Sequence, residues 1–146
     1  LFDVNVGGVM NTVLPVIPIL SARGAGQIAM VASLAGYRGI PGAPAYCATK
    51  AAVKVFGEGL TGTLHGLGVG VSVICPGYVR TPLTDANSFP MPFLMEADKA
   101  AQIIKRGLAK RKARIAFPWQ MATAVWVLQA LSPGLIEPIL RRLPKK

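Results

Sequence analysis

The sequence has few of the residues that build disulfides and metal sites. Its 146 residues include 2 cysteines, 1 histidine and 6 acidic residues. Two cysteines can form neither the disulfide framework of a small secreted protein nor a four-ligand zinc site. Cys47 and Cys75 have apolar or small neighbours, which predicts buried, reduced thiols in a cytosolic protein. His65 has no ligating partners nearby, so we expect it to face solvent and predict no metal site.

Charge is scarce and unevenly placed. Only 15% of the residues are charged and 52% are hydrophobic, which excludes a disordered chain. Residues 1–98 contain five bases and five acids, whereas from Lys99 onward eleven bases face Glu137 alone. The net charge of +10 therefore belongs to the last 48 residues. The chain begins Leu-Phe-Asp-Val-Asn without a secretory signal, so we expect it to start within a longer protein.

Apolar periodicity predicts helices alternating with short strands. The helix predicted at 45–66 carries three glycines, Gly57, Gly59 and Gly62. Their lack of side chains would let another helix approach closely. The predicted elements are a buried helix at 3–22 that is kinked or ended near Pro15 and Pro18, a strand at 27–33, a helix at 45–66, a strand at 69–75, an apolar loop at 83–95, a helix at 96–112 and a short strand at 113–117. The first two strands are apolar enough to be buried on both faces. This alternation predicts an α/β fold with a parallel sheet and right-handed crossovers.

Tyr46 and Lys50 stand four residues apart at the start of a predicted helix, so their side chains share one face. A lysine ammonium beside a phenol favours the phenolate and lowers the pKa of the tyrosine. Such a tyrosine can exchange a proton with a carbonyl or alcohol oxygen. Ser33 ends the first predicted strand and Pro76-Gly77 ends the second, and ligands of open parallel sheets bind at these carboxyl ends. We therefore expect all of these residues on one rim.

Together these motifs resemble the short-chain dehydrogenase/reductase family. The resemblance rests on the segments Asn5-Val-Gly-Gly8, Gly26 to Gly36 with Ser33, Tyr46-Cys-Ala-Thr-Lys50 and Pro76-Gly-Tyr-Val-Arg-Thr81-Pro82. Ser33 stands 13 residues before Tyr46, as in that family. The resemblance covers the chain up to about Phe117. It implies a catalytic half at 1–117 and a basic, apolar helical extension at 118–146.

The resemblance implies a role for each matching residue. Tyr46 would be the proton donor or acceptor, and Lys50 would depress its pKa while binding the nicotinamide ribose. Ser33 would bind the substrate oxygen, and Asn5 would hold a water linking Lys50 to solvent. The residues expected to line the nicotinamide end are Pro76, Gly77, Val79 and Thr81. The implied reaction is hydride transfer between NAD(P) and a carbonyl/alcohol pair, without a choice between NAD and NADP.

One family feature has no counterpart in the sequence. The glycine-rich turn that binds the cofactor diphosphate lies between a strand and a helix. Gly24-Ala-Gly26 instead precedes a strand, and the glycines around Gly57 and Gly66 lie in or after a helix. The resemblance thus implies an incomplete Rossmann-type sheet, with its last three strands and without its first four. We expect the fragment to be inactive, with a hydrophobic edge exposed on its first strand.

The C-terminal region is apolar between two basic segments. Prolines and Gly134 interrupt it, which predicts a hairpin of two short helices, the first at about 120–131, rather than a membrane span. With Trp119 and Trp126 the hairpin could lie in a membrane interface, or it could cover the substrate pocket or a subunit contact. No nucleic-acid-binding pattern is present.

The loop after Thr81 carries the apolar residues Phe89, Met91, Phe93, Leu94 and Met95, where the family places its substrate lid. This predicts a hydrophobic substrate. Two hypotheses stand at this point. In the first, the chain belongs to an NAD(P)-dependent oxidoreductase. We expect that enzyme to be cytoplasmic and a homo-oligomer, and in one alternative to be peripheral at the membrane. In the second, the chain is a non-catalytic membrane- or partner-binding module derived from such an enzyme. The filled catalytic positions favour the enzyme.

Overall fold

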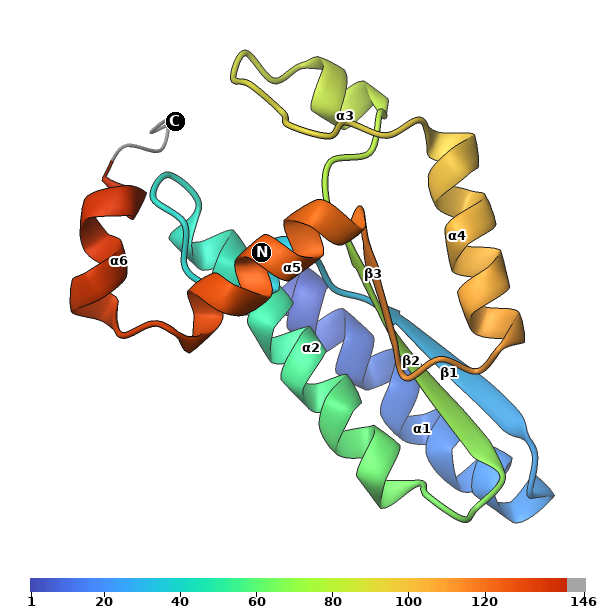
Figure 1. The fold of residues 1–146 in the computed structure, drawn as a ribbon. Coiled ribbons are helices and arrows are strands. Elements are labelled where there is room, and N and C mark those ends of the chain that lie inside the picture. Colours follow the sequence, from blue (N-terminus) through green and yellow to red (C-terminus); the bar gives the residue numbers. More distant parts are fainter. Residues whose placement is uncertain (142–146) are drawn as a thin grey trace.

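The computed structural model describes residues 1–141, so the last bases of the predicted basic tail lie outside the described residues. Its sheet has three parallel strands in the order β1-β2-β3, namely β1 (Gly26–Val31), β2 (Val69–Pro76) and β3 (Arg114–Phe117). Helices connect and flank these strands (Figure 1). The predicted α/β fold with a parallel three-stranded sheet is confirmed.

The helices fall into two layers and a C-terminal pair. The elements are η1 (Asp3–Gly7, a π-helical turn), α1 (Gly8–Arg23), η2 (Leu34–Gly36, a 3₁₀ turn), α2 (Pro44–Thr63), α3 (Pro82–Asp85), α4 (Ala97–Ala109), α5 (Trp119–Ala130) and α6 (Pro133–Leu140). In Figure 1, α1 and α2 run beside each other along the sheet, and α4 lies on its other side. The predicted C-terminal helical hairpin is confirmed as α5 and α6.

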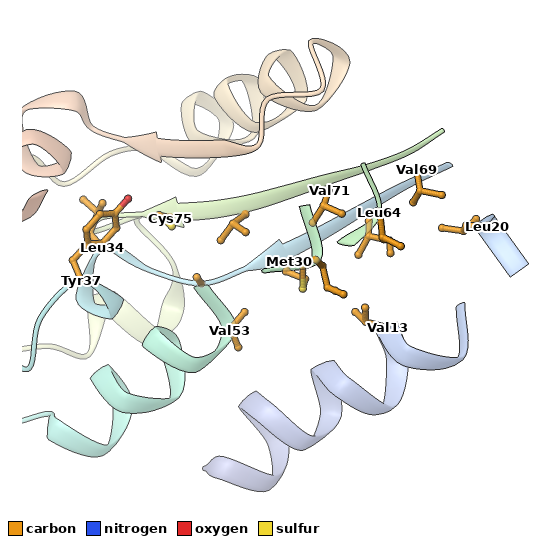
Figure 2. Close-up of a cluster of buried hydrophobic side chains, with 14 residues drawn as sticks. Val13, Leu20, Met30, Leu34, Tyr37, Val53, Leu64, Val69, Val71 and Cys75 are labelled. Carbon is orange, nitrogen blue, oxygen red and sulfur yellow. The ribbon is translucent and has the colours of Figure 1, made fainter. Parts of the chain in front are cut away.

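The main core lies between the sheet and the pair α1 and α2 (Figure 2). Successive strand residues point to opposite faces. Val71 and Cys75 of β2 therefore join Val13 of α1 and Val53 of α2 in this core, whereas Ile74 faces α4 in a smaller cluster. Both faces of β2 are buried, as predicted. Cys47 and Cys75 are free and buried, which confirms the prediction of buried thiols. His65 is exposed, which confirms that it faces solvent.

The prediction that β1 is buried on both faces is wrong. Its residues alternate, with Ile28 and Met30 buried and Ala29 and Val31 exposed. The exposed side faces away from α1 and α2, and α4 packs mainly on the other two strands. β1 is also an edge strand in the described sheet, so Val31, at 55% exposure, leaves apolar surface open.

The predicted end of the first helix at its prolines is wrong, and so is its predicted burial, because only Val13 and Leu20 of α1 are buried. The alternative of a kink at the prolines stays a prediction. α1 continues through Pro15 and Pro18 to Arg23. Both prolines are exposed, while Val13 and Leu20 are held against the sheet, so burial of the inner face outweighs the lost backbone hydrogen bonds. By length and composition Asp3–Arg23 could also cross a membrane, but a helix that covers a sheet passes the same test.

Two further predictions are corrected. The predicted loop after Thr81 begins with the short helix α3. Gly57 of α2 does not face another helix: a Cβ there would overlap Val73 and approach the Met30 Cε to 2.8 Å, so α2 itself lies close on the sheet at this point. Gly59 and Gly62 have open space beside them. The domain division at 117 and 118 stays a prediction, although parts of α5 pack against the main core.

Candidate active site

Ser33 follows the end of β1 and bridges the carboxyl ends of β1 and β2. Its hydroxyl accepts a hydrogen bond from the Ala35 amide at 3.1 Å, which caps η2, and donates one to the Pro76 carbonyl at 3.4 Å. The side chain is buried at 9% exposure. The carboxyl ends of β1 and β2 are thereby joined at the serine, as the sequence predicted for the rim.

Tyr46 and Lys50 lie in the first turns of α2, which begins at Pro44. Lys50 Nζ is 5.8 Å from the centre of the Tyr46 ring and donates a hydrogen bond of 3.1 Å to the Val31 carbonyl, at the end of β1. Burial lowers the pKa of Lys50. Tyr46 remains 38% exposed, so its ring is open to a ligand. The helix therefore brings a phenol and an ammonium to the edge that carries Ser33.

Asn5 is fastened to the same helix. Its side-chain amide donates to the Thr49 hydroxyl at 3.1 Å, and that hydroxyl donates to the Tyr46 carbonyl at 2.8 Å. Thr49 is fully buried, so these hydrogen bonds replace water that its hydroxyl cannot reach. Asn5 thus lies against the first turns of α2, beside Thr49. Its direct partner is Thr49, which sequence reasoning did not identify.

Gly36 explains how close the serine turn lies to α2. A Cβ at this position would come within 2.7 Å of the carbonyl carbon and oxygen of Lys50, both backbone atoms that cannot move aside. Only glycine allows η2 to touch the helix backbone in this way. The distance between Ser33 and the Tyr46–Lys50 face therefore depends on Gly36. The sequence shows it only as one glycine of a glycine-rich stretch.

The four residues predicted to line the nicotinamide end lie in the segment that leaves β2. Pro76 ends the strand, and the Gly77 amide donates to the Phe117 carbonyl at 2.7 Å. Val79 forms an isolated bridge with Met95, and Thr81 caps α3 by accepting a hydrogen bond from the Thr84 amide. A Cβ at Gly77 would lie 3.0 Å from Pro118, so its space is taken up by the start of α5.

Tyr78 is a neighbour of the site that sequence reasoning missed. Burial raises the pKa of its phenol, and the nearby Cys47 and Tyr46 raise it further. The ring packs edge to face with Phe89 at 6.1 Å between centres. Tyr78 therefore connects the catalytic tyrosine candidate with the apolar loop. In the sequence, only its position between Gly77 and Val79, two residues predicted to line the nicotinamide end, indicates that Tyr78 lies near the site.

A second group of polar side chains lies between α2 and the sheet, separate from the rim. Lys54 forms an ion pair with Glu58 at 3.5 Å, and Glu58 also pairs with Arg114 of β3. Lys54 Nζ lies 5.0 Å from the centre of the Tyr37 ring, while burial raises the pKa of Tyr37 to about 12. The Cys75 thiol lies near the phenol and also raises its pKa. This group connects α2 to β2 and β3. Glu58, the acidic residue of α2, is paired within it, so Lys50 has no acidic partner from α2.

The rim suits the nicotinamide ribose end of a dinucleotide. Lys50 carries three N–H donors and the Val31 carbonyl takes one of them, which leaves donors for a diol. The glycine-rich segment between β1 and α2 is a long loop that carries Ser33 and η2, and it has no Gly-x-Gly turn at the start of the helix. Within residues 1–141 the loops after β2 and β3 have no such turn either, so the described chain offers no cradle for the diphosphate. In the same residues no group of three or more His, Cys, Asp or Glu side chains could hold a metal ion.

Comparison with known proteins decides the family. The family model described as short chain dehydrogenase matches residues 1–90, which include Asn5, Ser33, Tyr46 and Lys50. The chain belongs to the short-chain dehydrogenase family. An uncharacterised oxidoreductase of Myxococcus xanthus is 41% identical over 99 residues, which cover 68% of this chain and 39% of that protein. An uncharacterised oxidoreductase of Mycobacterium tuberculosis is 29% identical over 100 residues, 68% of this chain and 38% of that protein.

Solved structures share the fold of this short-chain dehydrogenase chain. A short-chain dehydrogenase from Sphingobium yanoikuyae in complex with NADPH superposes with a TM-score of 0.77 at 23% identity, covering 99% of this chain and 56% of the other. One from Burkholderia cenocepacia in complex with NADP gives a TM-score of 0.79 at 21% identity, with coverages of 97% and 57%. The chain thus spans about half the length of these structures.

Proposed function

We propose that this short-chain dehydrogenase is an NAD(P)-dependent oxidoreductase that interconverts a carbonyl and an alcohol by hydride transfer. The observation that carries the proposal is the rim itself: Tyr46 and Lys50 share one face of α2, and Lys50 bonds the end of the strand that leads to Ser33. Phenol, ammonium and hydroxyl are the groups that proton transfer at a carbonyl oxygen requires. The oxidoreductase names of the relatives support the same reading.

Each residue of the rim has a defined task in the proposed reaction. The Tyr46 phenol gives its proton to the carbonyl oxygen in reduction and takes it back in oxidation. The Lys50 ammonium stabilises the phenolate, and the Ser33 hydroxyl donates a hydrogen bond to the same oxygen. Asn5 holds α2 through Thr49 and, in this proposal, orders a water beside Lys50. When bound, the nicotinamide supplies or accepts the hydride.

Pro76, Gly77, Val79 and Thr81 would hold the nicotinamide end. They follow β2 directly, at the carboxyl end of the central strand, where open parallel sheets bind ligands. The structures in complex with NADPH and NADP support a dinucleotide cofactor. The choice between NAD and NADP stays open, because the described residues include no adenosine-binding turn.

A hydrophobic substrate is the second part of the proposal. The loop between α3 and α4 carries Phe89, Met91 and Phe93, and Tyr78 links Phe89 to the neighbourhood of Tyr46. Phe93 is 54% exposed, so apolar surface is available to a ligand beside the rim. We further propose that a second copy of the protein covers α1, whose Leu14 and Ile19 are 51% and 64% exposed.

The test uses the longest chain encoded in frame with residues 1–146. Turnover of NADPH and NADH is measured with a panel of alkyl and aryl ketones, and of NADP and NAD with the matching alcohols. We expect turnover with hydrophobic members of the panel, and a loss of about 10² to 10⁴ in kcat for Tyr46→Phe. Tyr37→Phe makes the same chemical change away from the rim and should keep kcat.

Two results would overturn the proposal. Absence of turnover with every pair of cofactor and substrate would favour the non-catalytic binding module. Full activity of Tyr46→Phe would remove the tyrosine from the mechanism. Residues 1–146 alone should show no turnover and no tight NADPH binding in a calorimetric titration, because they lack the diphosphate turn; tight binding would contradict that expectation.

A further inference from the structure

α5 has an unusual surface for a helix on the outside of a protein. It carries no charged residue, and none of its residues is fully buried. Trp119, Trp126 and Val127 are 72%, 60% and 47% exposed. An exposed helix of a globular domain normally turns a charged or polar face to water. The outer surface of α5 is therefore suited to something other than water.

The exposed residues of α5 lie together. Met121, Ala122 and Val125 pack toward the main core and define the inner side. Trp119, Thr123 and Trp126 follow at helical spacing on the outside, because residues four and seven apart share a face. We call this outer surface the open side of α5; its residues are Trp119, Thr123, Trp126, Val127 and Ala130. Leu135 of α6, at 68% exposure, adds a further apolar side chain near its end.

Basic residues flank this apolar surface along the sequence. From Lys99 to the end of the chain there are eleven bases and one acid, Glu137, which pairs with Arg141. The bases before β3 lie at its far end, where Arg111 bonds the Gly26 carbonyl at the start of β1. On the other side of the strip Arg141 follows α6, and the sequence continues with Arg142, Lys145 and Lys146. The residues from 115 to 136 carry no charge at all. An apolar strip with tryptophans between cationic segments is complementary to a surface that is apolar inside and anionic outside.

We propose that the open side of α5 docks on the surface of an anionic lipid bilayer. The helix would lie in the interface, with the indoles of Trp119 and Trp126 at headgroup depth, where tryptophan is favoured. The bases that follow α6 would bind anionic headgroups. α5 does not cross the bilayer, because its 12 residues are fewer than the about 20 that a span requires.

α1 also has several exposed apolar residues, and its surroundings differ. Residues 1–98 contain equal numbers of bases and acids and no tryptophan. The surface around Leu14 and Ile19 therefore lacks both features that favour an anionic interface. This contrast assigns the bilayer to α5. The proposal concerns binding only and does not depend on the reaction proposed above.

The experiment uses the tryptophans as native probes, since both tryptophans of the 146 residues lie in α5. The full chain is mixed with vesicles of phosphatidylcholine alone or with phosphatidylglycerol added, at low and at high salt. We expect flotation with the anionic vesicles at low salt. We also expect a blue shift of the indole emission, and its quenching when the acyl chains near the headgroup are brominated.

Matched variants distinguish docking through α5 from nonspecific adsorption to the vesicles. Trp119→Gln combined with Trp126→Gln should weaken vesicle binding by about tenfold or more, which corresponds to ~1.4 kcal/mol or more. Val55→Gln, at an equally exposed apolar position of α2, should leave binding unchanged. Circular dichroism checks that each variant is folded. The quenching measurement uses the unsubstituted chain, so it tests the proposal even where a variant does not fold.

Three outcomes would overturn the proposal. The first is an absence of binding to anionic vesicles, and the second is binding that Trp119→Gln with Trp126→Gln leaves intact. The third is a change of mass in solution on that double substitution without any vesicle binding. That result would assign the open side of α5 to a contact between two copies of the chain.

Discussion

The Arg38 guanidinium holds the end of α5 through the Leu131 carbonyl. Its Nη1 donates to Leu131 at 2.7 Å and to the Leu128 carbonyl at 3.1 Å. The last carbonyls of a helix lack backbone partners, and a cation there also meets the negative end of the helix dipole. α5 has no basic residue of its own in its last turn. Arg38 lies on the loop between Ser33 and Tyr46, so the C-terminal hairpin is fastened to the loop of the proposed active site.

Replacing Arg38 should loosen α5. We expect Arg38→Gln to lower the free energy of unfolding by about 1–3 kcal/mol, because it removes charged hydrogen bonds to partly buried carbonyls. Urea unfolding followed by indole fluorescence measures this, since the tryptophans report α5. Arg106→Gln is the control, because Arg106 is exposed and bonds only the Gln102 carbonyl of its own helix among the hydrogen bonds described. Equal stability of the two variants would contradict the role of Arg38.

Gly36 should matter more than its neighbours. Alanine at this position would place a methyl group 2.7 Å from the Lys50 carbonyl and push η2 away from α2. We expect Gly36→Ala to lower both stability, by about 1–3 kcal/mol, and kcat in the longest in-frame chain, because Ser33 moves relative to Tyr46. Gly39→Ala, with nothing within 4 Å of its Cβ, is the matched control and should change neither. If the two alanines behave alike, the close approach does not position the serine.

The elements that carry the site could be read from the sequence because their signals are local. β2 is one apolar run stopped by Pro76-Gly77, and the four-residue spacing of Tyr46 and Lys50 fixes their shared face wherever the helix packs. Tertiary contacts could not be read in this way. Arg38 bonds Leu128 and Leu131, which come 90 and 93 positions later in the sequence, and the exposure of Ala29 depends on which helix covers β1.

Gly57 and Gly59 offer a direct test of how α2 packs. A Cβ at Gly57 would overlap Val73, so Gly57→Ala should lower the free energy of unfolding by about 1–3 kcal/mol. Gly59 has open space beside it, so Gly59→Ala should raise stability by about 0.5–1 kcal/mol through its higher helix propensity. Chemical denaturation of both variants gives the two signs. A gain at both positions would mean that α2 does not lie close on the sheet at Gly57.

The Tyr37 phenol should make the fold sensitive to alkaline pH. Burial, with a smaller contribution from Cys75, raises its pKa to about 12, although the Arg114 guanidinium acts in the opposite direction. In the unfolded chain a tyrosine loses its proton near pH 10, at about its ordinary pKa. Between these two values the unfolded chain binds fewer protons than the folded one, so stability falls as the pH rises.

Tyr37→Phe should remove this part of the pH dependence. The stability difference between the unsubstituted chain and Tyr37→Phe should be constant below about pH 10 and should shift in favour of the phenylalanine between about pH 10 and 12. Urea midpoints measured across this range test it, and titrations common to both proteins cancel in the difference. Because burial raises the pKa of the nearby Cys75 thiol, the comparison is repeated with Cys75→Ala in both chains. Parallel pH profiles in both backgrounds would show that the Tyr37 proton is not held by the fold.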